Sequence, residues 1–349
     1  MRVFVLKPDA IGDFVLATGT VHRIARACGE QNLILAVRAD VAPLAREEFP
    51  AAQVVALPIR EKRRLLNLTV VNVLNCLPVW IRLVGLRVDA AVCLRSMRTY
   101  LQTAIFLTPR AKRRIACENR LAEGARFRRP RVENFVRSAF RPVLLSYPSP
   151  GSWPTDLEAN RLVVAELLGE AIDPSEILPR LRARPRAQEE GGWLLCPFSS
   201  TRGKDYPDEK WVEVLLQLAP DRDAAPLLLA AGPAQQERLH ILKKLLDDAG
   251  VSCCALLPAG PLGDLVQAVS SARIVLTVDT AAAHIACATG RPAVIVSAGQ
   301  HPGVYAPYST NGLQDWVMPT PGLERGAWKT SLTPALVAER IRGMLSKYP

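Results

Sequence analysis

The sequence lacks the features of a zinc protein, a disulfide-rich protein and a secreted protein. Only four histidines occur in 349 residues, and none of the eight cysteines belongs to a Cys-x-x-Cys pair, so no zinc-site spacing is present. Most of the cysteines lie in apolar stretches, where a thiol behaves as a small hydrophobe, which predicts a reducing, cytoplasmic compartment. The start has no uninterrupted apolar run of the kind a signal peptide needs, because Lys7, Asp9 and Asp13 interrupt it.

Long hydrophobic runs are also scarce, and only residues 65–86 could be considered for a membrane span. Five residues in that run are costly at the centre of a bilayer. They are Asn67, Asn72, Asn75, Pro78 and Arg82. The run is therefore predicted to form a buried or interfacial helix.

Acidic residues are in short supply, which leaves a net charge of +11 and a pI of about 9.5. This excess indicates a polyanionic partner, and charge alone does not choose among nucleic acid, an anionic membrane surface and phosphorylated substrates. The aromatic interleaving of single-strand nucleic-acid platforms is absent from the basic clusters, and a phosphate-bearing acceptor at an anionic membrane explains the charge at least as well. The clusters are Arg60, Lys62, Arg63 and Arg64, and Lys112, Arg113 and Arg114 followed by Arg126, Arg128, Arg129 and Arg131.

The length fits two α/β domains with a cleft between them, and 49% hydrophobic with 22% charged residues is a normal globular balance. Residues 2–7 predict a strand, and helical spacing then runs from Phe14 to Cys28 before Gly29. A further strand at 33–37 completes a βαβ unit, which requires a parallel sheet. Further strands are predicted at 54–57, 89–94 and 113–116, and a capped helix at 155–169.

A second series of alternating strands and helices begins at Trp193, which again predicts a doubly wound parallel sheet. The predicted domains are 1–170, a connection at 171–192 with prolines, glycines and little periodicity, and 193–332. A C-terminal helix at 333–349 is expected, with packing back on the N-terminal domain left open. The fold class is thus α/β, with two Rossmann-like halves.

Asp13 is the first candidate for chemistry, because it follows the first strand and opens the first helix. Ligands of such sheets bind beyond the carboxyl ends of the strands, where a carboxylate could take a proton from an attacking hydroxyl. On position alone, however, a helix N-cap is the more common role of such an aspartate. The preceding Gly12 would allow another chain or a ligand to approach closely.

The segment from Asp279 to His284 is the second candidate. A strand ends at Val278, and the small residues that follow open a helix whose free amides can hold a diphosphate, with His284 one turn further as a donor. An N-cap aspartate with a buried histidine explains the same pattern equally well.

The loop that includes Ser199, Ser200, Thr201 and Gly203 offers hydroxyl and amide donors, and Lys204 offers a cation suited to phosphate. The loop is not a Walker A motif, and a solvated lysine is the commoner explanation. The occurrence of this loop together with the helix that begins near Asp279 favours a phosphate-binding role for Lys204. The Asp-x-Asp pair at Asp221 and Asp223 resembles a metal-binding pattern of sugar transferases, but it lies at the wrong end of the sheet.

Three segments in the right order resemble glycosyltransferase family 9, the lipopolysaccharide heptosyltransferases. They are MRVFVLKPDAIGDFVLATGTVHRIAR, CPFSSTRGKDYPDEKW and LTVDTAAAHIACATGRPAVIVSAGQHPGVYAPYS. The resemblance implies a GT-B fold with the two halves facing a central cleft, and inverting transfer without a metal or other cofactor. The donor would be a nucleotide sugar, ADP-heptose in this family, and the acceptor a lipopolysaccharide core or related phosphorylated glycolipid. The enzyme would be cytoplasmic, on the inner face of the inner membrane.

The resemblance also implies roles for individual residues. Asp13 would be the base, and Lys204 would neutralise the leaving diphosphate in place of a metal ion. Leu257 with Pro258 would contact the adenine. The donor-binding residues implied are Ser200, Thr201, Gly232, Gln236, Leu257, Asp279, Thr280, Ala281, Ala282, Ala283 and His284. The acceptor-binding residues implied are Gly12, Arg60, Arg63 and Arg64.

Several positions depart from the family pattern. Ala281 and Phe198 replace glycines, and Thr201 and Tyr206 stand where tryptophans are usual, so the donor pocket could differ from that of ADP-heptose enzymes. The alternatives are a relative that uses another nucleotide sugar or acceptor, and a non-catalytic homologue that binds a nucleotide or glycolipid. A nucleic-acid-binding protein is a third, disfavoured alternative. The sequence leaves the oligomeric state open.

Overall fold

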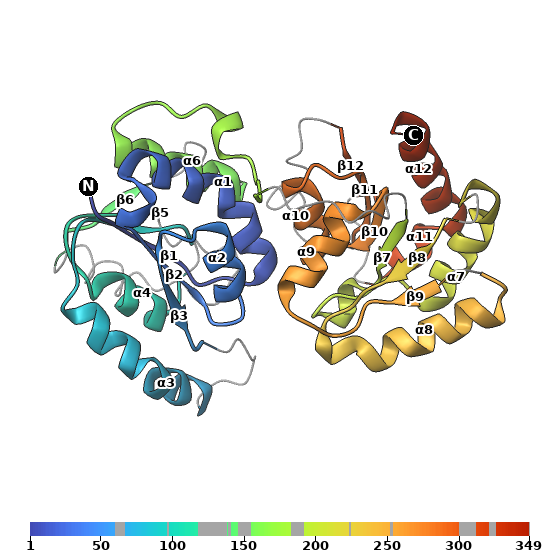
Figure 1. Ribbon diagram of the computed structural model, residues 1–349, viewed down its shortest axis with the longest axis horizontal. Coiled ribbons are helices and arrows are strands. Elements are labelled where there is room, and N and C mark those ends of the chain that lie inside the picture. The colour runs from blue at the N-terminus through green and yellow to red at the C-terminus, as the bar shows by residue number, and fades with distance from the viewer. Residues whose placement is uncertain are drawn as a thin grey trace. The chain divides into compact units, whose positions relative to one another are not determined.

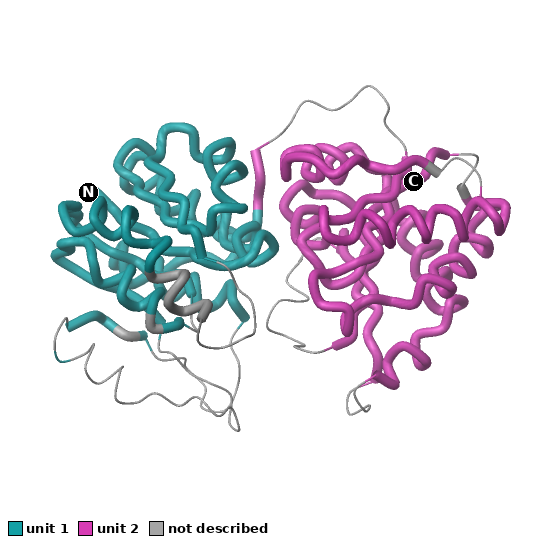
Figure 2. The backbone as a smooth tube through the Cα atoms, turned by 90° about the horizontal axis from the view of Figure 1, so that it is seen from below, with its two compact units in different colours: residues 1–179 teal, residues 180–349 magenta. Residues whose placement is uncertain are grey.

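A computed structural model of the chain divides into two compact units, Met1–Pro179 and Arg180–Pro349 (Figure 2). The division falls inside the predicted connection at 171–192. The residues that the structure describes are 1–59, 67–95, 98–117, 138, 141–145, 155–182, 192–222, 225–251, 254–299, 312–320 and 326–348.

Unit 1 contains a six-stranded parallel sheet with the strand order β3-β2-β1-β4-β5-β6 (Figure 1). This confirms the predicted parallel sheet and its first five strands, whereas β6 was not predicted. The strands are β1 (Val3–Lys7), β2 (Leu33–Arg38), β3 (Gln53–Leu57), β4 (Arg87–Cys93), β5 (Arg110–Cys117) and β6 (Val143–Leu145).

The helices of unit 1 follow the predicted signals closely. The side chain of Thr155 accepts a hydrogen bond from the amide of Glu158, and Gly169 ends the same helix with φ 72°. Gly29 ends the first helix with φ 80°. The helices are α1 (Ile11–Cys28), α2 (Ala42–Glu48), α3 (Asn67–Val84), α4 (Tyr100–Leu107) and α6 (Asp156–Leu168), with 3-10 turns η1 (Glu30–Asn32) and η2 (Pro174–Ile177).

The two faces of the unit 1 sheet are covered by different helices. Side chains alternate along β1, so Phe4 and Leu6 pack with α3 and α4 in one apolar core. Lys7 points to the opposite side, toward α6. The turn η2 contacts α1, so the first part of the predicted connection is folded onto unit 1.

Within the apolar run at 65–86, residues 67–84 form α3, which confirms the predicted helix. Among the residues described, no helix is long and apolar enough to cross a membrane.

Unit 2 repeats the topology of unit 1, with the strand order β12-β11-β10-β7-β8-β9 and parallel pairing throughout (Figure 1). The last strand was not predicted because its sequence, QDWV, is half polar. The strands are β7 (Trp193–Cys196), β8 (Leu227–Leu229), β9 (Cys254–Leu256), β10 (Ile274–Val278), β11 (Ala293–Val296) and β12 (Gln314–Val317).

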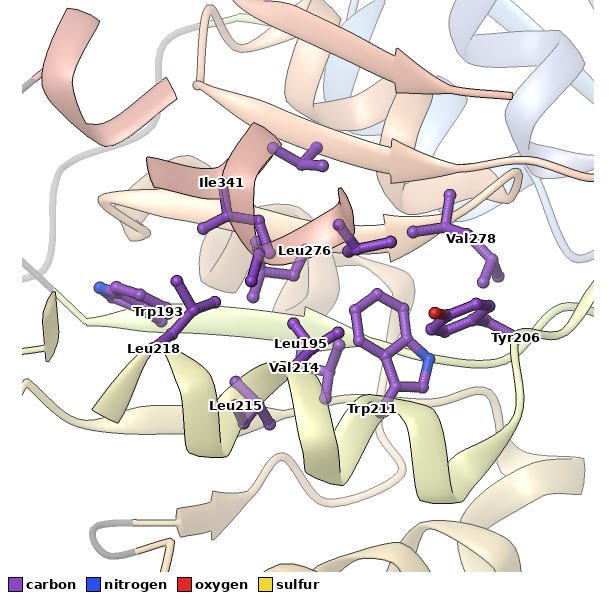
Figure 3. Packing of buried hydrophobic residues seen from close by; sticks show 14 of the residues in the cluster. Trp193, Leu195, Tyr206, Trp211, Val214, Leu215, Leu218, Leu276, Val278 and Ile341 are labelled. Carbon is purple, nitrogen blue, oxygen red and sulfur yellow. The ribbon is translucent and has the colours of Figure 1, made fainter. Parts of the chain in front are cut away.

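One face of the unit 2 sheet carries a core rich in large side chains. Figure 3 shows Trp193 and Leu195 of β7 against side chains of α7, with Ile341 of α12 beside them. The C-terminal helix therefore packs on α7, β11 and β12 of its own unit, and its contact with the N-terminal domain stays a prediction. The helices are α7 (Asp208–Gln217), α8 (Gln236–Asp248), α9 (Leu262–Ser271), α10 (Ala281–Ala288), α11 (Trp328–Ser331) and α12 (Pro334–Lys347), with 3-10 turns η3 (Arg202–Lys204), η4 (Ala219–Arg222) and η5 (Pro233–Gln235).

Candidate functional site

The first candidate region lies at the carboxyl edge of the unit 1 sheet, beyond β1 and β4. These strands are neighbours in the sheet, and the chain continues from them to opposite sides, which is the switch point where ligands of such folds bind. Lys7 is the last residue of β1, Asp13 lies in the first turn of α1, and Arg95 follows β4. The fold thus brings charged residues from three segments to one place.

Lys7 and Arg95 form ion pairs with two further residues, Asp9 and Asp156, and the charges of all four act on Asp13. The Nζ of Lys7 lies 3.1 Å from an oxygen of Asp156 and 3.3 Å from an oxygen of Asp9. Lys7 also donates a hydrogen bond of 3.0 Å to the carbonyl of Leu94, and Arg95 pairs with the other oxygen of Asp9. Only 1% of the Lys7 side chain is exposed, so its charge depends on these partners.

Burial and neighbouring charge perturb the acid groups of this network. Burial raises the pKa of Asp13 to about 7, and the negative charge of Asp9 adds to the increase, while Lys7 and Arg95 oppose it. Burial likewise raises the pKa of Asp156. Burial acts to lower the pKa of Lys7, but Asp156, Asp9 and Asp13 outweigh it and the pKa rises. A carboxyl group with a pKa near 7 is suited to general-base chemistry at neutral pH.

The alternative role of Asp13 as a helix cap is wrong. The N-cap of α1 is Ala10, without a side-chain hydrogen bond, and Asp13 is the third residue of the helix. Sequence reasoning placed the helix start too late, because Ile11 and Gly12 of the loop already have helical geometry.

Sequence reasoning also missed the network around Asp13. Lys7 carries a usable signal, since a lysine at the end of an otherwise apolar, buried strand needs an acidic partner. Asp156 carries none, because an acid in the first turn of a helix is ordinary.

The predicted acceptor residues are only partly described. Gly12 lies in the first turn of α1, next to Asp13. Arg60, Arg63 and Arg64 lie outside the described residues, as does the second basic cluster beyond Arg114.

The second candidate region lies at the equivalent edge of unit 2, beyond β7 and β10. These strands are hydrogen-bonded neighbours and again mark the switch point of the sheet. The hydroxyl of Thr277 in β10 donates to the carbonyl of Cys196 in β7 at 3.0 Å, which ties the two strand ends together. Lys204 and Asp279, which come from the two loops that follow, form an ion pair with an Nζ–Oδ2 distance of 2.7 Å.

The alternative role of Asp279 as a helix N-cap is wrong. The N-cap of α10 is Thr280, not Asp279, and Thr280 makes no capping hydrogen bond through its side chain. The first amides of α10, at Ala281 and Ala282, therefore gain nothing from a cap and remain suited to an anion.

His284 lies one turn into α10 and is buried. Burial lowers its pKa to about 4, although Asp279 acts in the opposite direction. The imidazole is consequently neutral at pH 7 and can offer a hydrogen bond but not a positive charge.

The loop that carries Lys204 is held by contacts within unit 2. The amide of Ser199 donates to Asp205 at 2.7 Å, and the second oxygen of Asp205 pairs with Arg238 at 2.7 Å. The guanidinium of Arg238 lies 4.0 Å from the ring centre of Phe198. Asp205 and Arg238 were not predicted, because their pairing depends on α8 lying beside the loop. Ser200 and Thr201 are exposed on this loop.

The substituted aromatic residues near this loop have structural contacts. Phe198 is buried beneath Arg238, and Tyr206 is fully buried with its ring edge-on to Trp211 at 5.3 Å. The Tyr206 hydroxyl donates to the carbonyl of Leu332 at 2.8 Å.

The other predicted donor residues lie at the same carboxyl edge. Gly232 and Gln236 follow β8, and Gln236 donates to the carbonyl of Ala231 at 2.9 Å. Leu257 follows β9 directly. Asp221 lies before β8 and pairs with Arg342, and Asp223 lies outside the described residues.

Comparison with known proteins agrees with this arrangement. The sequence model of glycosyltransferase family 9 (heptosyltransferase) matches residues 151–322. No curated protein matches the chain.

Several solved structures match over nearly the whole chain. E. coli heptosyltransferase WaaC with ADP is 17% identical, with a TM-score of 0.67, covering 100% of this chain and 99% of that one. The same enzyme with ADP-2-deoxy-2-fluoro heptose is 18% identical, with a TM-score of 0.69 and coverages of 98% and 99%. E. coli ADP-heptose lps heptosyltransferase II is 16% identical, with a TM-score of 0.71 and coverages of 99% and 99%. The expected GT-B architecture of two parallel α/β units is confirmed.

Proposed function

Because the chain belongs to glycosyltransferase family 9, we propose that it catalyses inverting, metal-independent transfer of heptose from ADP-heptose to a lipopolysaccharide core or a related phosphorylated glycolipid. The observation that carries the proposal is the meeting of Lys204 and Asp279 beside the N-terminus of α10. A cation and open helix amides at a switch point are the elements that a diphosphate requires.

The donor half of the reaction is assigned to unit 2. The diphosphate lies against the first amides of α10, and Lys204 exchanges its Asp279 partner for the phosphate oxygens. Leu257 contacts the base, and Gly232 and Gln236 lie near the ribose. The names of the similar structures, which hold ADP and a fluorinated ADP-heptose, support this class of donor.

The acceptor half is assigned to the cluster of unit 1. The Asp13 carboxylate takes the proton of the acceptor hydroxyl, whose oxygen forms a bond to the anomeric carbon of the donor sugar. The bond from that carbon to the diphosphate breaks on the opposite side, and its electron pair leaves with ADP. Lys204 and the α10 amides stabilise the charge that develops on the diphosphate.

The acceptor carries phosphates that Arg60, Arg63 and Arg64 bind, and Gly12 leaves room for its sugar beside Asp13. An acceptor embedded in lipid places the enzyme at the cytoplasmic face of the inner membrane. The net charge of +11 suits both the phosphates and an anionic surface.

Asp13→Asn tests the assignment of the base. This change keeps the shape of the side chain and removes its ability to accept a proton, so we expect turnover to fall by about 10²–10⁴-fold. Release of ADP measures turnover, and the melting temperature measured with and without ADP reports donor binding, which should be retained. The matched control is Asp89→Asn, an exposed carboxylate at the opposite end of β4, which should leave both properties unchanged.

The outcomes separate the proposal from its alternatives. If Asp13→Asn transfers sugar at close to the parental rate, Asp13 is not the base. A melting-temperature screen with ADP-, GDP-, UDP- and dTDP-sugars identifies the donor, because a ligand well above its Kd raises the transition. Stabilisation by a nucleotide sugar without transfer to any glycolipid would instead show a non-catalytic homologue.

A further inference from the structure

Helix α3 of unit 1 is apolar on both its faces. Cys76 and Leu83 are buried on the inner side and belong to the core below the sheet. On the outer side Leu74, Leu77, Ile81 and Val84 are 62%, 50%, 69% and 55% exposed. Their spacing of three and four residues places them in one stripe along the helix. The inner face of α3 is already buried, so a second apolar stripe on its outer face indicates a second apolar environment.

The surroundings of the stripe are basic. The one acid in residues 67–117 is Asp89, and it pairs with Lys112. Three exposed arginines lie at the C-terminal end of α3. Arg82 is on its last turn, and Arg87 follows it in the chain. Arg110 begins β5, and its amide donates to the carbonyl of Leu86, which places it at the same end of the helix. Within the described part of the chain, none of these three arginines has an acidic partner.

We propose that the outer face of α3 docks on an anionic phospholipid surface. Leu74, Leu77, Ile81 and Val84 enter the boundary between headgroups and acyl chains, and the three arginines contact the lipid phosphates. Because the inner face of α3 is packed in the core of unit 1, only its outer face can enter the lipid, and the helix lies in the plane of the interface. A second copy of the chain is a poor occupant, since it would bring the same basic surface against these arginines.

This inference goes beyond the proposed transfer reaction and does not depend on it, because binding is measured without any sugar substrate. The full-length protein is sedimented with vesicles of phosphatidylcholine alone and of phosphatidylcholine mixed with phosphatidylglycerol. We expect binding to the mixed vesicles that weakens as salt is raised, and little binding to phosphatidylcholine alone.

Two variants test the surface. Leu77→Gln with Ile81→Gln should lower the partition coefficient by about tenfold or more, since two apolar side chains no longer enter the lipid. Arg82→Gln with Arg87→Gln should lower binding to the mixed vesicles and reduce its salt dependence. The matched control is Leu216→Gln with Ile241→Gln, which changes two exposed apolar residues of unit 2 and should leave binding unchanged.

All of the substituted side chains are exposed, so the variants should unfold at the parental temperature, which a thermal melt verifies. Parental binding by the Leu77 and Ile81 double variant, or loss of binding in the unit 2 control, would overturn the proposal. The face would instead be assigned to a second copy of the chain if two results were found together. The parental protein would bind neither kind of vesicle, and it would be a dimer that dissociates when Leu77 and Ile81 are changed. Loss of transfer activity with intact vesicle binding would count against the proposed function alone.

Discussion

The two units have the same strand order but carry different charges at the same place in the fold. At the carboxyl edge of unit 1, Asp9 and Asp156 pair with Lys7 and Arg95 in a largely buried network, and Asp13 lies within reach of their charges. At the equivalent edge of unit 2, one lysine pairs with one aspartate beside a neutral histidine and the open end of a helix. The carboxyl edge of a Rossmann-like sheet therefore sets where a site lies. The charged residues at that edge decide whether the site is suited to proton transfer or to anion binding.

The apolar cores of the two units also differ in their residue types. The core of unit 1 beneath α3 and α4 is mainly aliphatic, whereas the unit 2 core contains Trp193, Tyr206 and Trp211. The large rings of unit 2 fix the loop that carries Lys204, because Tyr206 lies two residues beyond it and bonds to the carbonyl of Leu332.

The largest effect that would sharpen this comparison is expected for Lys204→Ala. Without the cation, charge on the leaving diphosphate is less stabilised, and we expect kcat/KM to fall by about 10²–10³-fold. Steady-state kinetics with varied donor concentration measures the change. The position of the pH profile should not move, because Asp13 and its neighbours are intact.

Lys243→Ala is the matched control for Lys204. Lys243 pairs with Asp247 on the surface of α8, at 2.6 Å, and should be dispensable for transfer. Equal losses in the two variants, or no loss with Lys204→Ala, would contradict the assignment of the diphosphate to unit 2.

The next largest effect concerns how closely each unit packs around a helical glycine. A Cβ at Gly19 of α1 would lie 2.0 Å from the carbonyl oxygen of Leu178 and 2.5 Å from that of Ile177. Gly19→Ala should therefore displace η2 and destabilise the protein by about 1–3 kcal/mol, the usual cost of overpacking. Denaturant unfolding measures the free energy.

Gly343 of α12 provides the opposite case in unit 2, because a Cβ there meets nothing within 4 Å. Gly343→Ala should stabilise the helix by about 0.5–1 kcal/mol. Destabilisation of similar size in both variants would show that the space around the glycine is not what separates the two sites.

The smallest effect is a shift in pH dependence. The base must be unprotonated, so with a pKa of about 7 for Asp13, kcat/KM should fall about tenfold for each unit of decreasing pH below that value. Asp9→Asn removes a negative charge that raises this pKa, so the acidic limb should move to lower pH. Rates measured across the pH range test this. A lower plateau with an unmoved limb would mean that Asp9 only supports the structure.

Local patterns predicted the elements of both units well. Apolar alternation and helix end signals located β1, α1, α6 and most of unit 2, because these signals depend on residues a few positions apart. The prediction missed β6, and it missed β12 because that strand is half polar. It also failed at the helix starts, where Asp13 and Asp279 were considered as caps although Ala10 and Thr280 hold those positions.

The sequence by itself determined that this chain is an α/β protein with two Rossmann-like units, and which loops hold its reactive side chains. Only the tertiary structure decided which side chains meet. Lys7 pairs with Asp156, 149 residues away, and Lys204 with Asp279, 75 residues away. The reason is that strand order brings β1 beside β4 and β7 beside β10, and this order follows from how whole apolar faces are buried together rather than from any local pattern.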